Sequence, residues 1–396
     1  MRAARLALAT SLLVVAAIGS LGSAQSGPSK GAPASPPVPP PPPPAIVRFD
    51  PRVFDIKFEA IIAGFPNSDQ PALQMEQLAF VLPIVFDSPT SRIDPSSMKP
   101  EMWFDNTKDK TLSQRAKIEG EKHLGQSWAI IPLAQFQGST LRWTVSFRGQ
   151  AWSVAADDNR LNQIAWPREW PKEVADALKP QLAIESDAPA VKAIVANTLG
   201  ENARTRPPYV AAKEIIRASI LSFRGVQTDT LERRGLGRIV GMRVVGAAQA
   251  LANQQGSTHD VLCTCIAALR AAGIPARPVI GIGEIKKGNG INNETKTTFL
   301  SWGQFYLPDA GWVSFDPEEL RGNAVRQLKP FDPWPGIGTL RDLNRRVAMT
   351  YSFMPEGLTP PAFPACWSFQ GTLGVYANRL ETYISLQMIN RGKGKN

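Results

Sequence analysis

The chain has 396 residues, which is enough for two or three domains with hydrophobic cores of their own. Its formal net charge is +10, but the basic residues are scattered and no nucleic-acid-binding motif accompanies them. We therefore interpret the charge as a solubility property with at most a weak attraction to polyanions, and we expect no nucleic-acid partner. Three cysteines are too few for a disulfide framework, and whether Cys366 forms a disulfide is left open.

The first 24 residues have the pattern of a secretory signal peptide. Arg2 and Arg5 precede an apolar run from about Leu6 to Ile18, and small residues at 22–24 fit a signal-peptidase site. The apolar run is shorter than the about 20 residues that a membrane span requires. We therefore expect a secreted or periplasmic, cell-envelope protein with no stable membrane span after cleavage near Ala24.

Two segments of different composition follow the signal peptide. Residues 25–45 are a proline-rich linker, which is a stiff and extended spacer without a core. In residues 46–165 apolar side chains alternate with polar ones, as at Phe54, Ile56 and Phe58, and this period of two predicts an antiparallel β-sandwich-like domain. Its tryptophans are expected to pack in the core or on strands rather than to form a ligand platform, namely Trp103, Trp128, Trp143 and Trp152.

From Trp166 the pattern becomes helical, and residues 166–329 are predicted to form an α+β domain in which helices precede consecutive strands. A helix is expected in WPKEVADALKP, where Val174 and Leu178 lie four residues apart. A second is expected in SDAPAVKAIVANTLG, capped by Ser186 or Asp187. Further helices are predicted over about 210–223 and 244–252, and strands near 277–283, 298–307 and 311–315. Residues 330–396 are predicted as a short β-rich extension with strand-like runs at 346–353 and 380–388.

The stretch GSTHDVLCTCIAALRAAGIPARPVIG, residues 256–281, predicts a helix followed by a strand. Ser257 or Thr258 is expected to cap the helix, and Asp260 suits the positive end of its dipole. Gly273 ends the helix and Pro275 prevents its continuation. Beyond it, the pair Gly281-x-Gly283 is interpreted as easing packing or turning rather than as a phosphate cradle.

The two cysteines of this helix do not form a metal site. Cys265 belongs to the apolar stripe of the helix and is expected in the core, whereas Cys263 points about 200° away from it. Histidines are scarce as well, since the chain has only His123 and His259. We therefore expect no metal and no cofactor.

The motif R-x-x-GIPAR, followed by W-x-x-x-Y-L-P and GW-x-x-x-DP, resembles the transglutaminase-like superfamily. Its pieces in this chain lie between Gly256 and Pro317, and the resemblance covers roughly residues 185–320. It implies an α+β fold: a transglutaminase-like, papain-like core preceded by the β-sandwich-like domain and followed by the β-rich extension.

The resemblance also implies where a catalytic triad would lie. The family uses a cysteine at a helix N-terminus, a histidine two residues before the tryptophan, and the aspartate of the DP motif. In this chain these positions fall on Thr258, Leu300 and Asp316, with His259 and Trp302 as further residues of the cleft. Losing a nucleophile or base removes on the order of 10⁴ to 10⁶ in rate, so we expect ordinary amide-group transfer to be lost.

Three hypotheses about function remain. The leading one is a catalytically inactive pseudoenzyme with a binding or scaffolding role in the cell envelope, where its partner would be an unidentified peptide, protein or glycan. The alternative is an active amide-directed hydrolase or acyltransferase that uses Thr258, His259 or Cys263 in an unusual arrangement. A histidine nitrogen within hydrogen-bond reach of a hydroxyl or thiol would favour that alternative. A third hypothesis makes residues 46–165 the binding module.

Overall fold

The structure is a computed structural model, and it describes most of the chain after the proline run. The described ranges are 43–66, 72–120, 123–132, 135–227, 230–234, 238–287, 294–322, 325–353, 368–375 and 377–394. Residues Pro44–Asn396 belong to one compact unit. The predicted signal peptide, nearly all of the predicted linker, and Cys366 lie outside the described residues.

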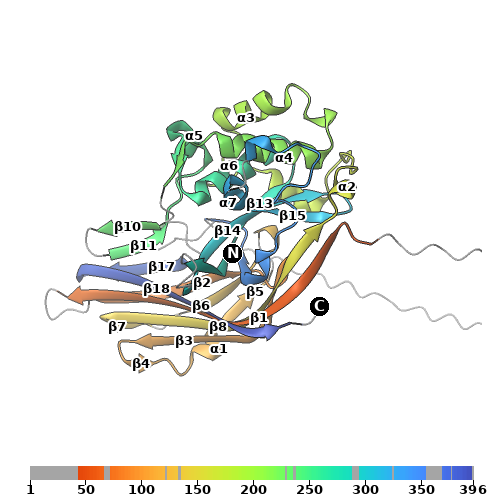
Figure 1. Cartoon of the computed structure of the whole chain (residues 1–396). Coiled ribbons are helices and arrows are strands. Elements are labelled where there is room, and N and C mark those ends of the chain that lie inside the picture. Colours follow the sequence, from red (N-terminus) through yellow and green to blue (C-terminus); the bar gives the residue numbers. More distant parts are fainter. Residues whose placement is uncertain are drawn as a thin grey trace, which may run out of the picture. The chain divides into compact units, whose positions relative to one another are not determined.

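Two sheets of the described residues combine strands from the N-terminal half of the chain with β17 and β18. One has the order β10-β11-β18-β1-β8-β3-β4 and is antiparallel except where β11 meets β18 (Figure 1). Its strands are β1 (Ile46–Pro66), β3 (Ser91–Phe104), β4 (Thr107–Lys108), β8 (Thr140–Ala156), β10 (Thr230–Arg234), β11 (Arg238–Met242) and β18 (Ala377–Lys393). The other has the order β17-β2-β6-β5, with β7 also paired to β2, and consists of β2 (Leu73–Ile84), β5 (Lys117–Glu119), β6 (Ser127–Pro132), β7 (Phe136–Gly138) and β17 (Ser368–Val375).

These two sheets pack face to face around one core, as the alternating pattern predicts. Phe54, Ile56 and Phe58 of β1 are all buried, because successive residues of a strand point to opposite faces. Phe80 of β2 stacks on Trp143 of β8 with ring centroids 4.8 Å apart, which joins the two sheets. The sandwich is therefore held by large apolar side chains from both layers.

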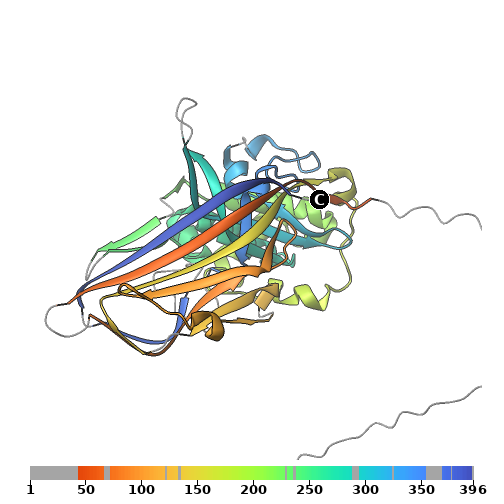
Figure 2. The same cartoon turned by 90° about the horizontal axis from the view of Figure 1, so that it is seen from below.

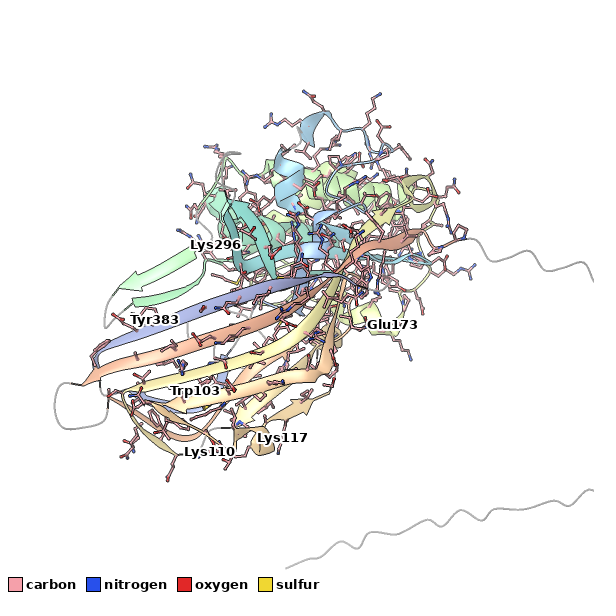
Figure 3. All side chains as sticks on the ribbon, turned by 60° about the horizontal axis from the view of Figure 1, so that its bottom comes forward. Trp103, Lys110, Lys117, Glu173, Lys296 and Tyr383 are labelled. Carbon is pink, nitrogen blue, oxygen red and sulfur yellow. The ribbon has the colours of Figure 1, made fainter. Side chains whose placement is uncertain are left out.

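The tryptophans of this region divide into buried and half-buried residues. Trp143 and Trp152 are buried, in agreement with the packing role expected for them. Trp128 and Trp103 are half-buried, and Figure 3 labels Trp103. The guanidinium of Arg142 lies 4.2 Å from the ring centroid of Trp103. The ring of Trp103 is thus partly covered by a neighbouring cation rather than presented openly.

Strands from both ends of the chain pair with each other. β18 lies against β1 over a long antiparallel register from Arg52–Lys393 to Pro66–Ala377, and β17 pairs with β2. Figure 2 shows β18, β1, β8 and β3 running side by side. The domain boundaries at 165/166 and 329/330 remain predictions from the sequence. Strands from both sides of each boundary pair within the same sheets.

The remaining strands and the longer helices form a separate layer of the same unit. Their sheet has the order β15-β14-β13-β16, made of β13 (Ala276–Lys287), β14 (Glu294–Leu307), β15 (Gly311–Phe315) and β16 (Arg346–Thr350). The helices α3 (Pro189–Leu199), α4 (Pro208–Leu221), α5 (Ala247–Asn253) and α6 (Thr258–Ala271) gather on one side of it (Figure 1). Shorter elements are α1 (Leu112–Arg115), α2 (Asp158–Leu161), α7 (Pro317–Gly322), the parallel pair β9 (Gly225–Val226) and β12 (Gln255–Gly256), and the 3-10 turns η1 (His123–Gly125), η3 (Ala203–Thr205), η4 (Val325–Gln327) and η5 (Asp342–Arg345). The α+β class predicted from the sequence is confirmed.

Two local predictions need correction. The segment expected as an α-helix around Val174 is a 3-10 helix, η2 (Lys172–Leu178), in which Val174 and Ala177 are buried. These residues are three apart, as the three-residue period of a 3-10 helix requires, so Leu178 is not the partner of Val174 on the buried face. The cap of α3 also differs, because its N-cap is Ala188 and no side chain caps it.

No helix within the described residues is both long and apolar enough to cross a membrane.

Two glycines of β13 are required by close packing, as their sequence pattern indicated. A Cβ atom on Gly281 would lie 2.3 Å from the backbone oxygen of Val347 and 2.8 Å from the ring of Trp302. A Cβ on Gly283 would lie 2.6 Å from Cδ1 of Leu300. A side chain at either position would therefore force β16 or β14 away from β13.

We expect Gly281→Ala to lower the free energy of unfolding by about 2–3 kcal/mol, because the added methyl group overpacks a site closed by backbone. Gly225→Ala is the matched control, since a Cβ on Gly225 meets no atom within 4 Å. Urea unfolding followed by circular dichroism measures both variants. Equal stability of the two variants would contradict the packing account of β13.

Candidate functional site

Helix α6 begins at Thr258 because a capping box fixes its first turn. Ser257 Oγ accepts a hydrogen bond from the Asp260 backbone N at 3.2 Å, and Asp260 Oδ2 accepts one from the Ser257 backbone N at 2.9 Å. Asp260 Oδ1 accepts from the backbone N atoms of Val245 and Gly246 at 2.7 and 3.0 Å. The fully buried carboxylate of Asp260 thus ties the start of α6 to the segment that leads into α5, and Ser257 is the cap.

The first turn of α6 also carries the histidine of the candidate site. Thr258 is half-buried at the first helical position, and His259 is only 5% exposed. Nδ1 of His259 lies 2.8 Å from Oγ of Ser301 on β14, and its ring is 5.8 Å from the ring of Phe353. A histidine nitrogen is therefore within hydrogen-bond reach of a hydroxyl, which is the contact that favours the enzyme hypothesis.

Leu300 and Trp302 lie on the other face of the same strand. In the antiparallel register Leu300 is opposite Gly281 and Trp302 is opposite Val279, without any register shift. Because side chains alternate along a strand, Ser301 points to the face opposite that of its two neighbours. Leu300 is half-buried, whereas Trp302 is fully buried.

Asp316 forms a structural ion pair on this second face. Its Oδ2 accepts from Nη1 of Arg346 at 2.6 Å, and the Arg346 guanidinium lies 6.0 Å from the ring centroid of Trp302. Oδ1 of Asp316 accepts from the backbone N atoms of Glu318 and Glu319 at 2.9 and 3.4 Å, at the start of α7. Leu300, Trp302 and Asp316 thus gather on one face of the sheet, while Ser301 makes its contact with α6 on the other.

Gly273 and the buried Arg270 of R-x-x-GIPAR hold the chain reversal between α6 and β13. Gly273 has a φ of 80°, which favours glycine, and it ends the helix. Arg270 Nε and Nη1 donate to the backbone oxygens of Ala276 and Lys179 at 2.8 and 2.6 Å. Burial lowers the pKa of Arg270 to about 9 and that of Arg277 to about 10. Arg270 therefore fastens the reversal, whereas Arg277 donates hydrogen bonds to Gln304 and to the backbone of Leu124.

The cysteines of α6 are core residues. Cys263 and Cys265 are both free thiols with no exposed surface, in one apolar cluster with α4 and β13. Burial raises the pKa of both thiols well above the ordinary value, and for Cys263 the nearby carboxylate of Asp260 adds to the effect. A protonated and shielded thiol is a poor nucleophile. Within the described ranges, no group of three or more His, Cys, Asp and Glu side chains is placed to hold a metal ion.

Comparison with known proteins bears on this region of the chain. Residues 239–317, which run from β11 to the first residue of α7, match the family model of the transglutaminase-like superfamily. The chain contains a transglutaminase-like domain.

Two solved structures are similar to this chain at low sequence identity. One is described as a candidate cysteine protease from Cytophaga hutchinsonii; it is 11% identical, with 87% of this chain and 92% of that chain covered and a TM-score of 0.49. Another is the periplasmic domain of TgpA from Pseudomonas aeruginosa bound to ethylmercury, which is 14% identical, with 70% and 94% covered and a TM-score of 0.30. At such identities and TM-scores neither carries an argument about activity. No curated protein matches the sequence.

Ser301 is the residue of this region that the sequence analysis missed. It lies between Leu300, which matches the family's histidine position, and Trp302, and the family motif gives no role to the position between them. The pattern of β14 contained the information, because in FLSWGQF the residues Phe299, Ser301 and Gly303 share a face. The sequence alone does not show that this face of β14 packs against α6.

In a Cys366→Ser variant, which leaves Cys263 and Cys265, we expect neither thiol to react with a thiol-directed maleimide in the native state. The reason is their full burial and raised pKa, so that labelling should require unfolding of the α6 core. Mass spectrometry of native and urea-unfolded samples measures the labelling. The unfolded sample should take up two labels, and rapid uptake of even one label by the native protein would contradict burial of the helix thiols.

Proposed function

We propose that the protein is an exported transglutaminase-like protein that binds or scaffolds in the cell envelope and does not carry out amide-group transfer. The observation that carries this proposal is the pair of residues at the family's nucleophile and base positions, Thr258 and Leu300. A threonine hydroxyl stays protonated near neutral pH and needs a base, and a leucine side chain supplies none. Without the pair, the chemistry of the family loses both its nucleophile and its proton acceptor.

The surroundings of the third position support this proposal. Asp316 is 4% exposed, and its carboxylate oxygens are occupied by Arg346 and by the backbone of α7. In the family such an aspartate orients a histidine, but here the guanidinium of Arg346 takes that place as its partner. These contacts give Asp316 a structural role, which is to stabilise the end of β15 and the start of α7.

An envelope location is supported by the sequence at the N-terminus. The pattern of residues 1–24 is that of a secretory signal peptide, and the proline-rich segment that follows has the composition of a stiff spacer. The positive net charge suits weak attraction to anionic envelope polymers. The partner of the proposed binding role would be an envelope peptide, protein or glycan.

A second candidate function rests on the contact between His259 and Ser301. The hydroxyl of Ser301 lies 2.8 Å from an imidazole nitrogen, as in a nucleophile and its general base. Compared with the family, the groups are exchanged: the histidine is on the helix, next to the nucleophile position, and the hydroxyl is on the strand, next to the histidine position. Such a pair would support an amide-directed hydrolase or acyltransferase with serine as the nucleophile.

We expect the purified mature protein to release no ammonia from glutamine-containing peptides and to incorporate no primary amine into them above the level of buffer. Ammonia release and amine incorporation are measured for the wild type, Thr258→Ala and Ser301→Ala. A wild-type activity that Thr258→Ala abolishes would overturn the proposal. An activity that Ser301→Ala abolishes and Thr258→Ala leaves intact would replace it with the second candidate.

A fluorophosphonate probe separates the two candidates directly. In an active serine site, Ser301 Oγ bonds to phosphorus, fluoride leaves, and His259 takes the hydroxyl proton. We expect no label on Ser301 when the native protein is compared with its heat-unfolded form, because the proposal gives the pair a packing role. Labelling of Ser301 that disappears in His259→Gln, with Thr258→Ala labelled as the wild type, would establish the serine site.

A further inference from the structure

A cavity of about 570 Å³ lies away from the first turn of α6, between the β-sandwich and the β13–β15 sheet. It is lined by the start of β1, by the turn that follows β2, by η1 and by the β14–β15 turn. Its apolar wall includes Ile46, Leu124, Trp312 and Tyr351, and its charged residues are Arg48, Asp87 and Arg277. This volume is within the range of small-ligand sites and would admit a ligand of dipeptide size.

Arg277 is the central polar group of the cavity. Its guanidinium lies between two aromatic rings, 3.9 Å from the ring centroid of Trp312 and 3.6 Å from that of Tyr351. Nε donates to Oε1 of Gln304 at 2.9 Å, and Nη1 donates to the backbone oxygen of Leu124 at 3.1 Å. Among the residues that the structure describes, none accepts a hydrogen bond from Nη2. The side chain of Arg277 is thus held in place through Nε and Nη1, and Nη2 can donate to an acceptor on a ligand.

The charge of Arg277 has no carboxylate partner within the described residues. Arg277 is 6% exposed, and burial lowers its pKa only to about 10, so the guanidinium is charged at neutral pH. Its protein partners are a neutral amide, a carbonyl and two aromatic faces. A buried cation with neutral partners is an uncompensated charge, and binding of an anion there would offset its desolvation.

A second cation stands at the same cavity. Arg48 donates from Nε to the backbone oxygen of Pro89 and from Nη2 to that of Ser88, both at 2.8 Å, with its guanidinium 4.8 Å from the ring centroid of Trp152. The one acidic side chain among the described lining residues, Asp87, is engaged by Arg92 at 3.3 Å. The cavity therefore has a surplus of positive charge.

We propose that this cavity binds a small ligand carrying a carboxylate and an apolar or planar group, with the carboxylate on Arg277 Nη2 and the apolar group along the wall of Ile46 and Leu124. A planar guanidinium fork is the donor geometry that suits a carboxylate. The carboxylate can come from a peptide C-terminus or from an acidic sugar. The inference goes beyond the proposed function and is independent of whether Thr258 or Ser301 has any chemistry.

The test is isothermal titration calorimetry of the full mature protein with N-acetyl-alanyl-phenylalanine and with the C-terminal amide of the same peptide. Glucuronate and glucose form a second matched pair, which distinguishes an acidic sugar from a peptide end. We expect the acid of at least one pair to bind. Its neutral counterpart should bind at least about 30-fold more weakly, because it lacks the charged hydrogen bond to Arg277.

Variants assign the site. Arg277→Gln should weaken binding of the acid about 30-fold or more, and Arg48→Gln should weaken it several-fold. Because Arg48 is exposed, Arg48→Gln should fold normally, so it tests the site even if the buried change Arg277→Gln impairs folding. Arg391→Gln is the control, because Arg391 is an exposed arginine of β18 that pairs with Asp55 of β1 and does not line the cavity. The inference is overturned if neither acid binds at millimolar concentration, if acid and neutral forms bind equally, or if the Arg48 and Arg391 variants behave alike.

Discussion

The burial of α6 is the constraint on which the other features of the transglutaminase-like domain depend. Residues His259 to Arg270 are buried without interruption, so the helix is surrounded by the other helices on one side and the β13–β15 sheet on the other. Only the first turn can bring a reactive group to the surface, and that turn is fixed by the carboxylate of Asp260. The chemistry of the domain is consequently decided by very few residues: those of the first turn and those that β14 places against it.

Much of this domain could be predicted from the sequence because the information is local. The capping residues, the glycine stop and the close-packing glycines of β13 are each set by neighbours in the chain or by the size of a side chain. Where prediction failed, the deciding factor was a competing local geometry, as in η2, where a short segment between Pro171 and Pro180 takes a three-residue period. The cap of α3 failed similarly, because Pro189 follows Ala188 directly and starts the helix there.

The candidate site was harder to predict because it depends on pairings between distant segments. Nothing near Ser301 in the sequence says that its face of β14 meets His259, and this follows only from the packing of α6 on the sheet. The cavity around Arg277 is a similar case, since Trp312 comes from β15 and Tyr351 directly follows β16. Pairing of β18 with β1 likewise joins the two ends of the folded unit and leaves no trace in either strand alone.

The two candidate functions differ in a single physical respect, which is whether an alcohol beside an imidazole is activated or merely buried. The hydrogen bond between His259 and Ser301 is compatible with both, because the buried imidazole of His259 needs a polar partner even when the pair has no chemical role. Thr258 and Leu300 at the triad positions, and the ion pair of Asp316 with Arg346, favour a packing role for the His259–Ser301 pair over a catalytic one. The most direct measurement is intact-mass spectrometry, with peptide mapping, of the mature protein incubated with an activated acyl ester. The account predicts no acyl adduct on Thr258, Ser301 or either helix cysteine, and a stoichiometric adduct on any one of them would contradict it.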